Sequence, residues 1–168
     1  LRQCPGNPRV VTVAIEVEEK YVLPLAASRG ARFDPGQMVE MARVADEGGF
    51  GSIWVSDHFS GAVVDAPWSR DPFVCLGAMA AVTQRVDIGL LVGNITNRHP
   101  VQLASAANSL QSLSPGRVRL GVGSGSAPGS RFAAEHDMVG KKLAATPSRQ
   151  QHLRDTIGAL RAIWAGES

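Results

Sequence analysis

The pair Asp57-His58 is the place in this sequence where acid–base chemistry is easiest to build. It follows directly on Ile53-Trp54-Val55, an apolar run that is typical of a short buried strand. A neutral imidazole there can hydrogen-bond to a ring system or act as a general acid or base. A lone histidine is more often structural, so the position after a strand is what favours function. No second His or Cys stands at metal-ligand spacing, and we expect no metal site.

The segment Gly121-Val122-Gly123-Ser124-Gly125-Ser126 resembles a phosphate-binding loop. A dinucleotide-binding fingerprint needs a third glycine at position 126, where this chain has Ser126, and no helix starts directly afterwards. We therefore interpret the segment as a tight strand end, at which side chains would obstruct a ligand.

Three further groups of residues are ambiguous from the sequence alone. The run Thr96-Asn97-Arg98-His99-Pro100 reads as a capped helix start with a solvated arginine. The polar residues Glu135, His136 and Asp137 could reach a site, but a solvated loop is the simpler interpretation. Trp68 lies in a long loop and fits either a ring-stacking lid or ordinary packing.

The elements that must position these residues alternate along the chain. Strand-like apolar runs begin near residues 10, 52, 86 and 118, the first being Val10 to Ile15. Helix starts follow at Asp34-Pro35, Asp71-Pro72, Pro100 and Ser148. One strand and one helix every thirty to forty residues indicate an α/β fold with a parallel sheet. We expect one domain over residues 1–168, with residues 16–33, 57–70, 93–99 and 124–147 forming loops at the carboxyl ends of the strands.

Composition narrows the classes of protein. The chain has 168 residues, a formal net charge of +2, 44% hydrophobic and 19% charged residues, so we expect a globular domain that binds neither nucleic acid nor membrane. Cys4 and Cys75 do not form a disulfide framework of secreted type, which favours a reduced, cytoplasmic protein. The chain does not begin with Met, which indicates a processed chain or a fragment.

Several segments together resemble the luciferase-like monooxygenase family, especially its deazaflavin (coenzyme F420)-dependent oxidoreductases. In chain order these are Ala45-Asp46-Glu47-Gly48-Gly49-Phe50-Gly51-Ser52-Ile53-Trp54-Val55-Ser56-Asp57-His58-Phe59, Asp71-Pro72-Phe73-Val74, Thr96-Asn97-Arg98-His99-Pro100-Val101-Gln102-Leu103-Ala104 and Ser114-Pro115-Gly116-Arg117-Val118-Arg119-Leu120-Gly121-Val122-Gly123-Ser124-Gly125. The resemblance covers residues 36–168. It implies a (β/α)8 barrel of TIM type, of which this chain supplies the first four units, a half barrel whose first and fourth strands would be open edges.

The resemblance also implies roles for particular residues. Asp57 and His58 would contact the reactive ring system and serve as the catalytic residues. A bulge at Leu91-Val92, often with a non-prolyl cis peptide in this family, would back the central ring, and Asn94 lies in the same loop. Gly123, Ser124 and Gly125 would line the substrate side of the ring. Some sugar-phosphate members carry a catalytic Glu just after this point, where this chain has Ser126.

Three functions stay open at this stage. The first is an oxidoreductase that uses reduced coenzyme F420 for hydride transfer to a small organic substrate. The second is an FMN-dependent monooxygenase of the same fold. The third is a non-catalytic half barrel that acts as a dimerisation module, because the family members are about twice as long and carry the main cofactor-phosphate site in the half that this chain lacks. We expect a homodimer, and activity of this chain alone is an open question.

Overall fold

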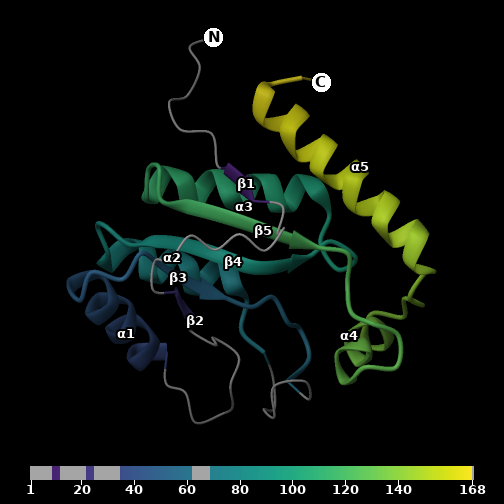
Figure 1. The fold of residues 1–168 in the computed structure, drawn as a ribbon, viewed down its shortest axis with the longest axis horizontal. Helices are drawn as coiled ribbons and strands as arrows, with labels where there is room; N and C mark the ends of the chain where they lie inside the picture. Colours follow the sequence, from purple (N-terminus) through teal and green to yellow (C-terminus); the bar gives the residue numbers. More distant parts are fainter. Residues whose placement is uncertain (1–8, 12–21, 25–34, 62–68, 168) are drawn as a thin grey trace.

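The computed structural model describes residues 9–11, 22–24, 35–61 and 69–167, and Figure 1 shows their arrangement. Five strands form one parallel sheet in the order β1-β5-β4-β3-β2. Their bounds are β1 Arg9–Val11, β2 Val22–Pro24, β3 Ser52–Val55, β4 Asp87–Asn94 and β5 Val118–Gly123. The parallel sheet and the alternation of strands with helices confirm the α/β architecture predicted from the sequence.

The first strand of the repeat was assigned wrongly. The place beside β3 belongs to β2, at residues 22–24, inside the stretch 16–33 that was expected to be a loop. The run that begins at Val10 instead contributes β1, which pairs with β5 at the opposite edge of the sheet. The fourth strand of the predicted repeat is β5, and the expectation that it would be an open edge was wrong. Residues 12–15 of that run lie outside the described residues. Strand β2 has only three residues, and its identity depends on pairing with β3 rather than on a local pattern.

Helices follow the strands and pack side by side, α1 on α2, α2 on α3 and α3 on α5. Their bounds are α1 Pro35–Glu47, α2 Pro72–Val82, α3 Pro100–Leu113, the short α4 Ala134–Met138 and α5 Thr146–Ala165. The predicted cap of α2 is confirmed, because Asp71 Oδ1 accepts the backbone N–H groups of Phe73 and Val74 at 2.9 and 3.2 Å. Asp34, the expected cap of α1, lies outside the described residues.

The core lies between the helices and one face of β3, β4 and β5. Alternate strand residues such as Ile53, Leu90 and Leu120 are at most 1% exposed and meet Leu76, Leu103 and other apolar helix residues. Cys75 is part of this core and is a free thiol, whose pKa is raised by burial. No helix within the described ranges combines the length and apolar character that a membrane span requires.

Candidate functional site

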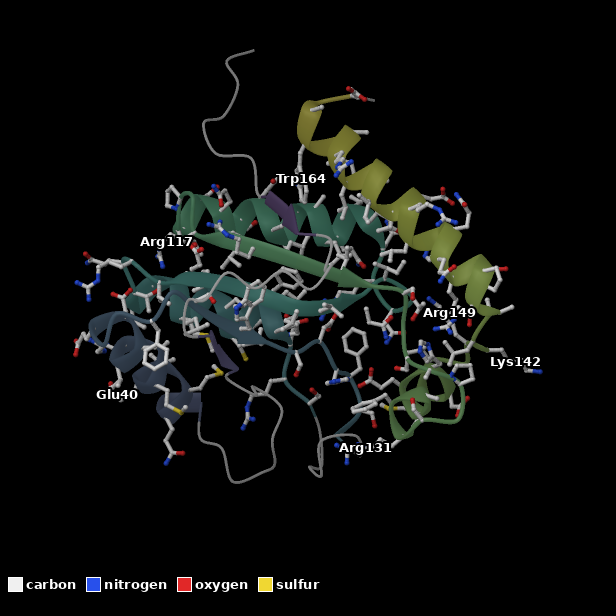
Figure 2. All side chains as sticks on the ribbon, viewed as in Figure 1. Glu40, Arg117, Arg131, Lys142, Arg149 and Trp164 are labelled. Carbon is white, nitrogen blue, oxygen red and sulfur yellow. The ribbon has the colours of Figure 1, made fainter. Side chains whose placement is uncertain are left out.

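The carboxyl ends of β3, β4 and β5 meet at one end of the sheet, beside α4 (Figure 1). Arg131, Lys142 and Arg149 are gathered at this end, whereas Glu40 and Arg117 lie toward the opposite end (Figure 2). In parallel α/β folds the carboxyl end of the strands is where active sites are built. The residues predicted from the sequence to act on a ligand follow β3 or lie in β4, β5 and the loop after β5, so the fold brings them to this end.

Asp57 is held by a bidentate ion pair with Arg98. The Nε and Nη2 atoms of Arg98 lie 2.7 and 2.8 Å from the two carboxylate oxygens, and the backbone N–H of Asn94 donates to Oδ2 at 3.0 Å. Arg98 also reaches Asp71 Oδ2 at 2.9 Å. The side chain of Asp57 is fully buried, so the ion pair fixes the β3 end against the loop that follows β4.

The expectation of a solvated Arg98 was therefore wrong. Its side chain is 13% exposed, and its guanidinium lies 4.9 Å from the ring centroid of Phe59 and 5.4 Å from that of Phe73. Burial works against its charge, but the hydrogen bonds and charges of Asp57 and Asp71 outweigh that effect and raise the pKa of Arg98. The arginine is a permanent cation inside the site, and it neutralises Asp57.

His58 is held by Glu135, which comes from α4. The Nδ1 atom of His58 lies 3.0 Å from Glu135 Oε1, and the same oxygen accepts the backbone N–H groups of Phe59 and Ser60 at 2.9 and 3.2 Å. Glu135 is 1% exposed, so the expectation of a solvated loop at this residue was wrong. The ring of Phe132 stacks on the imidazole, with centroids 5.2 Å apart. A carboxylate can only accept, so this contact assigns the proton of the neutral ring to Nδ1 and leaves Nε2 as the atom with a lone pair.

The strand β4 carries the irregularity that the resemblance implied. The peptide between Leu91 and Val92 is cis, and the register of β4 against β5 shifts between Leu90 and Gly93. The side chain of Leu91 is 41% exposed. On β5, a Cβ atom at Gly123 would lie 2.7 Å from Cγ2 of Val92, so only glycine lets the two strands approach here. Val92 fills the space beside Gly123, and the exposed Leu91 leaves an apolar side chain on the surface at the bulge.

The other residues predicted to bind the cofactor, Asn94, Ser124 and Gly125, contact Thr96 or Arg149. Asn94 Oδ1 accepts the backbone N–H of Thr96 at 3.1 Å and its hydroxyl at 2.6 Å. Gly125 has a positive φ of 90° and lies close to Thr96, since a Cβ at Gly125 would be 3.1 Å from Thr96 Cγ2. The carbonyl of Ser124 accepts from Arg149 at 3.3 Å. The structure thus brings Asn94 and Gly125 together, and it ties Ser124 to the start of α5.

The sequence did not reveal the residues that hold Asp57 and His58. Glu135 and Arg98 act on residues 77 and 41 positions away in the chain, and the signal that could have found them was an acidic and a basic residue in loops that leave the same end of the sheet. His136, also expected in a solvated loop, is 2% exposed, whereas Asp137 is exposed as expected. Trp68 lies outside the described residues.

Comparison with known proteins assigns the family. The family described as luciferase-like monooxygenase matches residues 19–168. The chain belongs to this luciferase-like monooxygenase family. An F420-dependent glucose-6-phosphate dehydrogenase from Microbacterium testaceum is 34% identical over 137 residues, which are 81% of this chain and 39% of that protein. The resemblance to the F420-dependent branch of the luciferase-like family is therefore confirmed.

Solved luciferase-like structures agree with the half-barrel interpretation. An F420-dependent secondary alcohol dehydrogenase, in complex with an F420-acetone adduct, superposes with a TM-score of 0.71 at 26% identity, over 86% of this chain and 41% of that one. The oxygenating constituent of 3,6-diketocamphane monooxygenase from Pseudomonas putida, in complex with FMN, gives 0.71 at 23% identity, over 86% and 39%, and shows the fold alone. The chain spans about two fifths of the length of these relatives, so the prediction of a half barrel is confirmed.

Proposed function

We propose that this chain is the part of an F420-dependent oxidoreductase that holds the reactive face of the cofactor ring. The observation that carries the proposal is the imidazole of His58, oriented by Glu135, at the same end of the sheet as the exposed apolar bulge at Leu91-Val92. Support comes from two of the relatives, the F420-dependent glucose-6-phosphate dehydrogenase and the F420-dependent secondary alcohol dehydrogenase. Coenzyme F420 supplies the hydride chemistry when it is bound, and the protein supplies position and proton handling.

The contacts of each residue suggest its role in the proposed function. The exposed Leu91 offers an apolar surface to the ring, and Val92 packs against Gly123 next to it in the chain. His58 Nε2 takes up or releases the proton that accompanies hydride transfer to or from a small organic substrate, while Nδ1 stays bound to Glu135. Asp57 is committed to Arg98, and we assign it the positioning of the loop that bears His58 rather than a proton transfer of its own. Asn94, Ser124 and Gly125 complete the cofactor-binding set.

Cofactor titration tests this function. The full chain is titrated separately with F420 and with FMN, following the absorbance and fluorescence of each cofactor. We expect F420 to bind and FMN to bind more weakly. A tighter complex with FMN would favour the monooxygenase alternative, and binding of neither by a folded chain would contradict the proposal.

A matched pair of variants locates the surface. Leu91→Asn replaces an apolar side chain at the bulge that is 41% exposed, and covering that part is worth about 0.6–1.2 kcal/mol, so F420 affinity should fall about three- to eightfold. Leu113→Asn makes the same change at another exposed leucine, 61% exposed at the end of α3, and should leave affinity unchanged.

Sedimentation of the same samples tests the predicted homodimer. A tight dimer that binds neither cofactor would favour the dimerisation module.

A further inference from the structure

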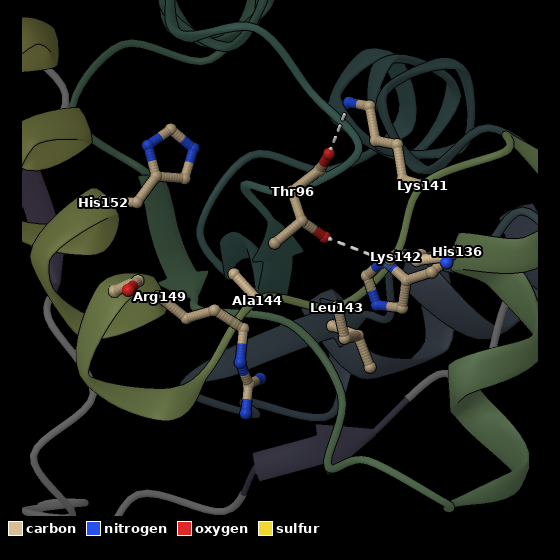
Figure 3. Close-up of a pocket in the computed structure, with 9 residues that line it drawn as sticks. Thr96, His136, Lys141, Lys142, Leu143, Ala144, Arg149 and His152 are labelled. Carbon is tan, nitrogen blue, oxygen red and sulfur yellow. Dashed lines mark hydrogen bonds between the residues drawn. The ribbon is translucent and has the colours of Figure 1, made fainter.

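A cavity of about 210 Å³ lies between the loop after β4, the residues around α4 and the start of α5 (Figure 3). Its lining includes two lysines, one arginine and two histidines, and no Asp or Glu: Lys141, Lys142, Arg149, His136 and His152. At about 30 Å³ per water molecule, the space holds a tetrahedral oxyanion together with several waters. Positive charge without an acidic partner in a concave site favours an anionic ligand.

Two buried nitrogen atoms of the lining have no partner among the described residues. They are Nε2 of His136 and Nε of Arg149, on residues that are 2% and 7% exposed. Buried polar atoms in folded proteins are nearly always hydrogen-bonded, so these two atoms leave residues of the cavity lining with unused hydrogen-bonding capacity. Arg149 is otherwise fixed, because its Nη1 donates to the carbonyls of Ser124 and Ser126 at 3.3 and 2.8 Å.

The hydrogen bonds around Thr96 assign the proton on His136. The Thr96 hydroxyl donates to Asn94 Oδ1 at 2.6 Å, so it has only lone pairs left for His136 Nδ1, 3.3 Å away. The neutral ring therefore carries its proton on Nδ1 and leaves Nε2 with a free lone pair. A second proton on Nε2 makes it a donor to an anion.

Burial, more than the nearby charges, lowers the pKa of His136. Arg149 and Lys141 lower it further, and Glu135 and Asp137 act in the opposite direction. Lys142 and His152 also line the cavity, and both are exposed. An anion seated here would add the charge that the ring needs to become imidazolium.

We propose that this cavity binds a tetrahedral oxyanion, the phosphoryl group of a small-molecule ligand, and that His136 takes up a proton when the anion binds. The ligand is either a phosphorylated substrate or a phosphorylated cofactor, and the two share this recognition chemistry. The proposal does not rest on the proposed function, because an inorganic oxyanion should bind whether or not F420 does.

Sulfate is the probe, because it stays a dianion across the working pH range. Calorimetric titration at constant ionic strength should show saturable binding at pH 8 that is about threefold or more tighter at pH 6, since one bound proton changes affinity by up to about tenfold per pH unit. The Lys141→Gln, Lys142→Gln double variant should lose most of the affinity. The His136→Gln variant should keep weak binding and lose the pH dependence.

The control removes the same charge from α5, outside the cavity lining. Arg154→Gln with Arg161→Gln alters two exposed arginines outside the cavity lining and should bind sulfate as the parent does. Equal loss in both double variants, or no saturable sulfate binding by the folded parent, would overturn the proposal.

Two pairs of compounds identify the source of the phosphoryl group. Glucose 6-phosphate against glucose tests a phosphorylated substrate, and FMN against riboflavin tests a phosphorylated cofactor. We expect one phosphorylated member to displace sulfate and its dephosphorylated partner to fail. Sulfate binding that neither phosphorylated compound displaces would mean an adventitious ion only, and the proposal would fail.

Discussion

The two ends of the sheet use buried polar groups differently. At the amino end, Asp46 accepts three backbone N–H groups, from Gln84, Arg85 and Val86, at 2.7–3.1 Å. Arg117 donates to the carbonyls of Thr83 and Val86 and to the Thr83 hydroxyl at 2.8–3.0 Å. The Asp46 bonds tie α1 to the residues that lead into β4, and the Arg117 bonds tie the start of β5 to the end of α2 and to Val86.

At the carboxyl end, Glu135, His136 and Arg149 each have a buried polar atom without a hydrogen-bond partner among the described residues. Glu135 uses Oε1 three times, whereas its buried Oε2 has no partner among the described residues. His136 and Arg149 each keep one such nitrogen. A saturated polar cluster stabilises the fold, and a cluster with spare donors and acceptors is available to a ligand. The Asp46 and Glu135 clusters differ in this respect, and Gln111 Oε1 in α3 and Trp164 Nε1 in α5 are also buried without a partner among the described residues.

The ion pair at Asp57 is the strongest test of this difference, because it is a saturated cluster at the carboxyl end. Replacing Arg98 by Met leaves the fully buried Asp57 carboxylate without its partner, and such a loss costs about 3–5 kcal/mol. Urea unfolding measures the free energy. Arg43→Met, which breaks an exposed pair with Glu40 at 3.6 Å, should change it by about 0–1 kcal/mol. Similar losses in the two variants would mean that Asp57 is not dependent on Arg98.

Asp46 gives the next largest effect. Its two oxygens both accept backbone N–H groups, so the amide of Asp46→Asn must turn a donor toward a donor, and we expect a loss of about 1–3 kcal/mol. Burial acts to raise the pKa of Asp46, but the three hydrogen bonds outweigh it and leave the pKa below the ordinary 3.8.

The sign of the pH dependence at Asp46 follows from that lowered pKa. The unfolded chain binds the proton first as pH falls, so stability is complete above the ordinary pKa of 3.8 and declines as pH drops through the lower folded value. Unfolding measured from pH 6 to pH 2.5 should show this decline in the parent and a flatter profile in Asp46→Asn. Equal slopes would contradict it.

Local chemistry explains what the sequence could predict. The cap at Asp71 and the position of Asp57-His58 after a strand depend on residues within a few positions of one another. The strand β2 has three residues and no pattern of its own, so only its pairing with β3 defines it. Arg98, Glu135 and His136 were interpreted as solvated because their partners lie 27 or more positions away, and burial of a charge depends on those distant partners.

Glu135 should tolerate a change that Asp46 does not. Only Oε1 accepts hydrogen bonds, so the amide oxygen of Glu135→Gln can take the same role toward Phe59, Ser60 and His58. We expect the loss of the charge-assisted part alone, about 1 kcal/mol, in the same urea experiment. A larger loss than in Asp46→Asn would show that Oε2 has a structural partner, and the contrast between the two ends would weaken.

The last prediction concerns the position of one proton, on the imidazole ring of His58, and it tests the site directly. The Glu135 contact assigns the proton of neutral His58 to Nδ1, so ¹⁵N NMR at a pH where the ring is uncharged should show this tautomer. His152, an exposed residue of α5, is the control, and a solvated imidazole favours the proton on Nε2. In Glu135→Leu the resonances of His58 should move toward those of His152. If the parent already shows the Nε2 tautomer, Glu135 does not orient the ring, and His58 Nε2 would not be the proton acceptor that the proposed function requires.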